Sequence, residues 1–161
     1  QDSVFLINTK DSIIRIYKQP NSKNLAHYSK SIYKGFIPEL GLFVFWNEVH
    51  EGGSFYGINI NTKEKIFFYG YPKFSPNRTM ILSSYYDIEF GFYVNGFELY
   101  NFKNDTIEKV FHYEPTAGWG PEGMIWKNDS TLYFMRQTWD QSGLYNKRYL
   151  QSVKFRKIAN R

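Results

Sequence analysis

The sequence predicts an all-β protein built from antiparallel four-stranded meander units, and three observations lead to that prediction. Aromatic residues make up 20% of the 161 residues, and aromatic side chains fit the pleated, half-buried surface of a strand. Apolar and polar residues alternate in many segments, which is typical of strands with one buried face. Short polar segments containing Pro, Gly, Asn or Asp separate the apolar runs, and such segments indicate turns.

The strand-like segments group into three units that follow the same order of strands and turns. The first unit (residues 32–71) has expected strands at 32–37, 42–46, 54–60 and 65–69, with a polar loop at 47–53. The second unit (72–118) has them at 73–74, 79–85, 96–102 and 107–113, with a loop at 87–95. The third unit (119–161) has them at 123–126, 131–138 and within 149–158, and it lacks a fourth strand. Together with residues 1–31, these units are expected to form one domain.

The N-terminal 31 residues are expected to form a hairpin and a connector. Its strands, residues 4–7 and 13–17, could complete the last unit or cap the first one. A short helix could form over residues 25–33.

Composition excludes several classes of protein and site. With 22% charged residues, 12 Gly and 6 Pro, the chain is neither disordered nor collagen-like. The absence of Cys excludes disulfides, a thiol nucleophile and Cys-based metal sites. No apolar stretch approaches the roughly 20 residues that cross a bilayer, so we expect a soluble chain without a membrane span.

The formal charge of +5 is spread along the chain as single residues and pairs such as Lys147-Arg148. This pattern is typical of a solvated basic surface, and we expect no nucleic-acid partner. The chain begins Gln1-Asp2-Ser3, as a secreted protein does once its signal peptide is removed, although a trimmed chain would begin the same way. We therefore expect an extracytoplasmic protein, periplasmic or secreted.

One segment resembles a known repeat. Phe74-Ser75-Pro76-Asn77-Arg78, followed by Ile81-Leu82-Ser83-Ser84, is similar to the blade motif of TolB-type, WD40-like β-propellers, in which Phe-Ser-Pro-Asp-Gly precedes a hydrophobic strand. Asn77 and Arg78 stand where the motif has Asp and Gly. Gly96-Phe97-Glu98-Leu99-Tyr100 looks like the inner strand of such a blade. The chain also resembles small uncharacterised exported bacterial proteins with this pattern.

The resemblance implies a propeller-like arrangement, but propellers have four to eight blades, and this chain has three units and a hairpin. A ring with a patched last blade, an open arc that pairs with another copy and a collapsed sandwich all remain possible. Exposed sheet edges in the last two cases would suit a homo-oligomer.

In a meander, the longer loops and the links between units leave the sheets at one end, and the tight turns leave at the other. Long loops on a sheet scaffold often carry binding sites. We therefore expect the partner to bind residues of the long-loop end: His50, Glu51, Asp87, Glu89, Trp119, Glu122, Trp139 and Asp140.

Two of these residues are tryptophans in expected loops. Trp119 and Trp139 could anchor a partner or stack on a sugar ring, or they could plug a small core. His50 beside Glu51 could bind a cation, but a solvated loop histidine is the more common case.

Carboxylate pairs are the minimum for glycoside hydrolysis, and Asp87 with Glu89 or Glu122 with Asp140 could supply one. The sequence contains no nucleophile elbow, phosphate loop or dinucleotide fingerprint. We assign no catalytic residue, metal ligand or cofactor.

These observations favour a non-enzymatic binding module of the bacterial envelope or exterior that recognises protein or glycan through its loop rim. The alternative is a small carbohydrate-acting hydrolase that uses rim carboxylates. A structural subunit of a larger complex is a third hypothesis.

Overall fold

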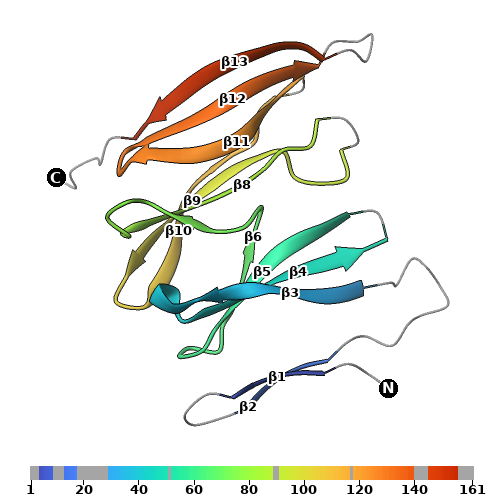
Figure 1. The fold of residues 1–161 in the computed structure, drawn as a ribbon, viewed down its shortest axis with the longest axis vertical. Coiled ribbons are helices and arrows are strands. Elements are labelled where there is room, and N and C mark those ends of the chain that lie inside the picture. Colours follow the sequence, from blue (N-terminus) through green and yellow to red (C-terminus); the bar gives the residue numbers. More distant parts are fainter. Residues whose placement is uncertain are drawn as a thin grey trace. The chain divides into compact units, whose positions relative to one another are not determined.

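The computed structural model describes residues 4–8, 13–17, 29–50, 52–88, 91–116, 118–139 and 145–155, with the backbone alone at 4–8, 13–17, 139, 145 and 146. The described residues form antiparallel strands and one turn of 3-10 helix at Pro38–Leu40 (Figure 1). The prediction of an all-β fold made of antiparallel meander units is therefore confirmed. No helix among these residues is long and apolar enough to cross a membrane.

The chain divides into two compact units, residues 1–68 and 69–161, which are described separately. In the first unit, β1 (Val4–Asn8) pairs only with β2 (Ile13–Tyr17) among the described strands. A separate four-stranded sheet follows in chain order, with the strands β3 (Ser29–Ile37), β4 (Leu42–Val49), β5 (Gly52–Asn59) and β6 (Lys65–Phe68). This sheet is the meander predicted for the first repeat.

Two details of the first unit differ from the sequence-based expectation. The helix expected over residues 25–33 is wrong from Ser29 onward, because β3 begins there and pairs with β4 from Ser29↔Val49 to Ile37↔Leu42. Residues 25–28 lie outside the described part. The loop expected at residues 47–53 is mostly strand, since β4 runs to Val49 and β5 starts at Gly52. In the sequence, only residues 50 and 51 separate the two strands.

An aromatic row crosses all four strands of the first unit. Tyr33, Phe45, Tyr56 and Phe67 are direct cross-strand neighbours, and Phe45 stacks on Tyr56 with ring centroids 5.1 Å apart. The Lys65 ammonium lies 3.9 Å from the Tyr56 ring centroid. Phe45 and Tyr56 at the centre of the row form a buried cluster with Ile58, whereas Tyr33 and Phe67 at its two ends are exposed.

The second unit contains two sheets. One is ordered β10-β9-β8-β7, with β7 (Lys73–Phe74), β8 (Met80–Tyr85), β9 (Gly96–Lys103) and β10 (Thr106–Tyr113). The other has three strands, β11 (Trp119–Asn128), β12 (Thr131–Trp139) and β13 (Tyr145–Lys154). The four-stranded meander predicted for residues 72–118 is confirmed, and the described residues of 119–161 form three antiparallel strands.

The positions predicted for the two loop tryptophans are wrong. Trp119 is the first residue of β11 and Trp139 is the last residue of β12. The strands extend further than their apolar alternation suggests because Trp119 and Thr138, and then Gly120 and Gln137, pair across the sheet.

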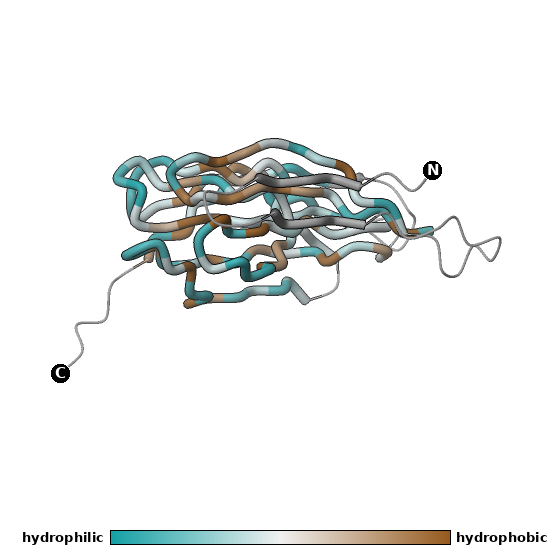
Figure 2. Tube along the Cα trace, turned by 90° about the horizontal axis from the view of Figure 1, so that it is seen from below, coloured by the Kyte–Doolittle hydropathy of each residue, from teal (hydrophilic) through white to brown (hydrophobic). Residues whose placement is uncertain are grey.

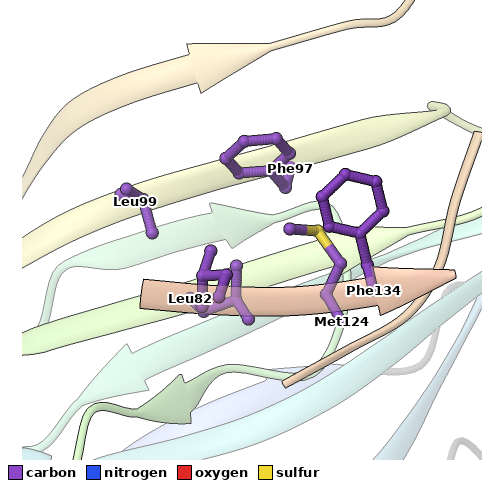
Figure 3. Packing of buried hydrophobic residues seen from close by; sticks show 6 residues of the cluster. Leu82, Phe97, Leu99, Met124 and Phe134 are labelled. Atoms are coloured by element: carbon purple, nitrogen blue, oxygen red, sulfur yellow. The ribbon is translucent and has the colours of Figure 1, made fainter. Parts of the chain in front are cut away.

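The two sheets of the second unit pack through one apolar cluster. Leu82, Phe97 and Leu99 contribute from β8 and β9, and Met124 and Phe134 contribute from β11 and β12 (Figure 3). Hydrophobic and hydrophilic residues are interspersed along the chain (Figure 2). This mixture is expected where a strand buries only one of its two faces.

The turn in the propeller-like motif is closed by its own side chains. The Asn77 Oδ1 atom accepts hydrogen bonds from the Ser75 hydroxyl, the Thr79 hydroxyl and the Thr79 backbone N–H, at 2.8–3.0 Å. Arg78 has a φ of 59°, the left-handed conformation that favours the glycine of the motif. This segment therefore keeps the turn although it departs from the motif at both positions.

Candidate functional site

The loop end of the second unit brings a buried amide side chain, Gln137, and a partly buried one, Asn95, to one face of the three-stranded sheet. Gln137 lies on β12, directly opposite Gly120 on β11. Asn95 precedes β9 and reaches over the same position, since a Cβ atom built on Gly120 would lie 2.3 Å from the Asn95 Oδ1 atom. Only a glycine at position 120 leaves room for Asn95 there.

The orientation of each amide is fixed by its partner. The Asn95 Nδ2 group donates to the Trp119 carbonyl at 2.9 Å, and a carbonyl can only accept. The Arg148 Nε–H donates to the Gln137 Oε1 atom at 3.3 Å, and a guanidinium can only donate. The other two amide atoms, Asn95 Oδ1 and Gln137 Nε2, are therefore fixed as an acceptor and a donor.

These two atoms are buried and have no hydrogen-bond partner among the described residues. Gln137 as a whole is only 1% exposed. A buried amide group that lacks a hydrogen bond costs about 1–3 kcal/mol. Each of these atoms could bond to a hydroxyl group, because a hydroxyl both donates and accepts.

Two more charged side chains lie beside the amides. The Arg148 Nε atom, which already holds Gln137, is 3.5 Å from the Glu122 Oε2 atom. Arg148 is more than half exposed and Glu122 is about one-third exposed. Because an exposed ion pair contributes little to stability, this pair is available to a partner with little loss to the fold.

The indole ring of Trp119 packs against neighbouring side chains of the second unit. The Arg136 guanidinium carbon lies 4.6 Å from the Trp119 ring centroid, and the Phe134 ring stacks near-parallel to it at 6.2 Å. Trp119 also packs against the core cluster. Of the two roles expected from the sequence, this geometry favours the packing role over an open stacking surface.

Asp87 is engaged by the backbone of its own loop. Its two carboxylate oxygens accept hydrogen bonds from the backbone N–H groups of Gly91 and Tyr93, at 3.3 and 2.8 Å. Asp87 and Glu122 are the two predicted loop-rim carboxylates that the structure describes, and each lies beside a hydrogen-bond donor.

The remaining predicted site residues are less fully described. His50 is exposed in the tight β4–β5 turn of the first unit. Glu51, Glu89 and Asp140 lie outside the described residues, as does the Trp139 side chain. Among the residues that the structure describes, no cluster of three or more His, Asp or Glu side chains could hold a metal ion.

A second polar network, which the sequence did not point to, lies on the four-stranded sheet of the same unit. Glu98 is 1% exposed, and its carboxylate accepts hydrogen bonds from the Tyr100 hydroxyl at 2.6 Å and the Tyr69 backbone N–H at 3.2 Å. It also pairs with the Lys109 ammonium. Burial, followed by the hydrogen bond to Glu98, raises the pKa of Tyr100 well above its usual range.

The network continues at the neighbouring strand. The Tyr69 hydroxyl donates to the Glu114 carboxylate at 2.6 Å, and the His112 Nε2 atom lies 3.0 Å from the same oxygen. Burial and then the Glu114 carboxylate raise the pKa of Tyr69, and the hydrogen bonds from Tyr69 and His112 lower the pKa of Glu114. Each group in this network has a partner, so it fixes residue 69 against the sheet rather than presenting an open site.

No family model, curated protein or solved structure matches the chain. The resemblance to TolB-type propeller blades therefore stays a prediction from the sequence. What the protein does has to be argued from the loop end of the second unit.

Proposed function

We propose that this protein is a non-enzymatic recognition module of the cell envelope or exterior that binds a glycan through the loop end of its second unit. The observation that carries the proposal is that two buried amide atoms near Gly120, the Asn95 Oδ1 acceptor and the Gln137 Nε2 donor, have fixed orientations and no partner among the described residues. Sugar hydroxyls match this donor and acceptor, and the chemistry of a hydroxyl-rich ligand also suits the adjacent Arg148 and Glu122.

Recognition is favoured over hydrolysis by what the carboxylates already do. Glycoside hydrolysis needs a pair of carboxyl groups that face the scissile bond. Both carboxylate oxygens of Asp87 accept hydrogen bonds from backbone N–H groups, and the Glu122 carboxylate lies beside the Arg148 guanidinium. The described geometry therefore supports binding without chemistry.

A binding assay on the full chain tests the proposal. The probe is an immobilised panel of neutral, acidic and N-acetylated oligosaccharides, and sugars that bind are followed by calorimetry. Gln137→Met keeps the side-chain length but removes the amide, so it should weaken binding about tenfold, the equivalent of 1.4 kcal/mol. Gln151→Met, on β13 of the same sheet, is the matched control and should leave affinity unchanged.

Three results would contradict the proposal. The first is a panel on which no sugar binds. The second is a sugar whose affinity is the same for Gln137→Met and the parent chain. The third is sugar turnover, which would revive the hydrolase alternative. If the chain binds a protein partner and sugars do not inhibit that binding, protein recognition would replace glycan recognition as the proposed function.

A further inference from the structure

The three-stranded sheet of the second unit ends in a long strand with a free edge. The other meander sheets have four strands each, whereas this one stops at β13 (Figure 1). Among the described strands, only β12 pairs with β13, over the register from Thr131↔Lys154 to Trp139↔Tyr145. The opposite edge of this ten-residue strand carries backbone groups that no described strand satisfies.

One hydrogen bond shows which backbone N–H and C=O groups of β13 point toward the free edge. The Phe155 N–H donates to the Ser130 carbonyl at 2.7 Å, so the peptide groups of residue 155 point toward β12. Because successive residues of a strand point their N–H and C=O groups to opposite sides, those of Arg148, Leu150 and Ser152 point outward. These groups form an evenly spaced row of donors and acceptors.

The free edge carries charges at Lys147, Arg148 and Lys154, but the segment from Tyr149 to Val153 at the centre of the strand has none. Natural edge strands are commonly guarded by proline, bulges or charges. From Lys147 to Lys154, β13 contains no proline, and its register with β12 is unbroken. The Arg148 side chain is drawn back toward Gln137 and Glu122. At the centre of the strand, Leu150 is 68% exposed and Tyr149 is 48% exposed.

We propose that β13 pairs antiparallel with β13 of a second copy of this chain, across a two-fold axis at Leu150. A two-fold axis perpendicular to a sheet requires a residue to face its own counterpart, and Leu150 is the most exposed apolar residue of the strand. In this register Arg148 faces Ser152 and Lys147 faces Val153 of the second copy. The pairing opposes no like charges, which are destabilising when directly opposite.

This register uses the outward backbone groups fully. Each outward residue then faces another outward residue, and such a pair exchanges two hydrogen bonds. The outward positions 148, 150 and 152 lie in the regular part of the strand, and they would form about six hydrogen bonds and join two three-stranded sheets into one. The self-complementary register favours a second copy over an unrelated partner strand.

Sedimentation analysis of the full chain over a wide concentration range tests the proposal. The parent chain should approach twice its 19.2 kDa mass as concentration rises. Ser152→Pro removes the outward N–H of residue 152, because proline has no N–H. The apolar surface and the N–H groups that bond to β12 are kept. This variant should stay monomeric. Leu150→Lys should do the same by placing two like charges on the axis. Ser152→Ala should associate like the parent.

Ile125→Lys separates edge pairing from packing through the face of the sheet. Ile125 is 54% exposed on β11, at the far side of the same sheet, and its replacement should leave association unchanged. Circular dichroism on each variant verifies that the strands are retained. A parent chain that stays monomeric at every concentration would overturn the proposal. So would a dimer that survives Ser152→Pro and Leu150→Lys, or one that Ile125→Lys alone abolishes.

Discussion

Replacing Glu98 with alanine should strongly destabilise the second unit. Its buried carboxylate accepts hydrogen bonds from the Tyr100 hydroxyl and the Tyr69 N–H and pairs with Lys109. Glu98→Ala leaves both donors without their acceptor, and a buried unsatisfied donor costs about 1–3 kcal/mol. With two donors affected, we expect a decrease of about 2–6 kcal/mol in the free energy of unfolding, and the lost packing acts in the same direction.

Two variants separate the hydrogen bonds from the charge. Glu98→Gln keeps one acceptor oxygen and should cost about 1–2 kcal/mol. Lys109→Met leaves both other donors bonded but removes the counter-charge of the buried Glu98 carboxylate, so it should also destabilise the chain and thereby measure the contribution of the charge. Urea unfolding followed by tryptophan fluorescence gives the free energies. A Glu98→Ala chain within about 1 kcal/mol of the parent would refute the reasoning, because the network would then contribute less than one ordinary hydrogen bond.

Three further predictions concern stability. Tyrosines of the unfolded chain ionise near pH 10, whereas the raised pKa values of Tyr69 and Tyr100 keep both protonated in the folded state. The folded state therefore binds more protons than the unfolded state, so the free energy of unfolding should fall as pH rises above about 10. The fall should be shallower in Tyr100→Phe. Equal slopes of this free energy against pH in the variant and the parent, measured by urea unfolding, would contradict the prediction. Asp105 has a φ of 59°, a conformation that glycine adopts without steric cost. Asp105→Gly should therefore raise the free energy of unfolding by several tenths of a kcal/mol or more. A lower melting temperature for this variant would count against the prediction. We expect the hairpin to pack its apolar side chains in the domain, so deleting residues 1–18 should cost several kcal/mol at roughly 1.5–3 kcal/mol for each buried large aliphatic side chain. A deletion variant that melts like the parent would contradict this expectation.

The positions of the tight turns could be predicted from the sequence because their residues act locally. Asn77 closes its turn through its own side chain, and Asn104 and Asp105 form the two-residue β9–β10 turn with positive φ at both positions. Strand ends were harder to predict. Trp119 and Asn47 look like loop residues, yet cross-strand pairing with Thr138 and Ser54 keeps them in strands.

The candidate site was only partly predictable. Glu122 was expected at the loop end, but its closeness to Arg148 depends on the pairing of three strands. Gln137 looks in the sequence like any polar strand residue, and its burial depends on what covers the sheet. Glu98 carried a weak signal, because strand alternation places it on the same face as Tyr100, away from Phe97 and Leu99. Interactions across strands cannot be read from the order of residues alone.

A nuclear magnetic resonance titration that follows the side-chain amide signals of Gln137 and Asn95 shows whether a glycan binds at these two amides. A sugar selected from the oligosaccharide panel should shift the Gln137 Nε2 protons, because that group gains a hydrogen bond to the ligand. The amide of Gln151, on the same sheet, should not move. The account would be contradicted if the sugar binds while the Gln137 amide stays unshifted, or if the Gln137 and Gln151 amides shift equally.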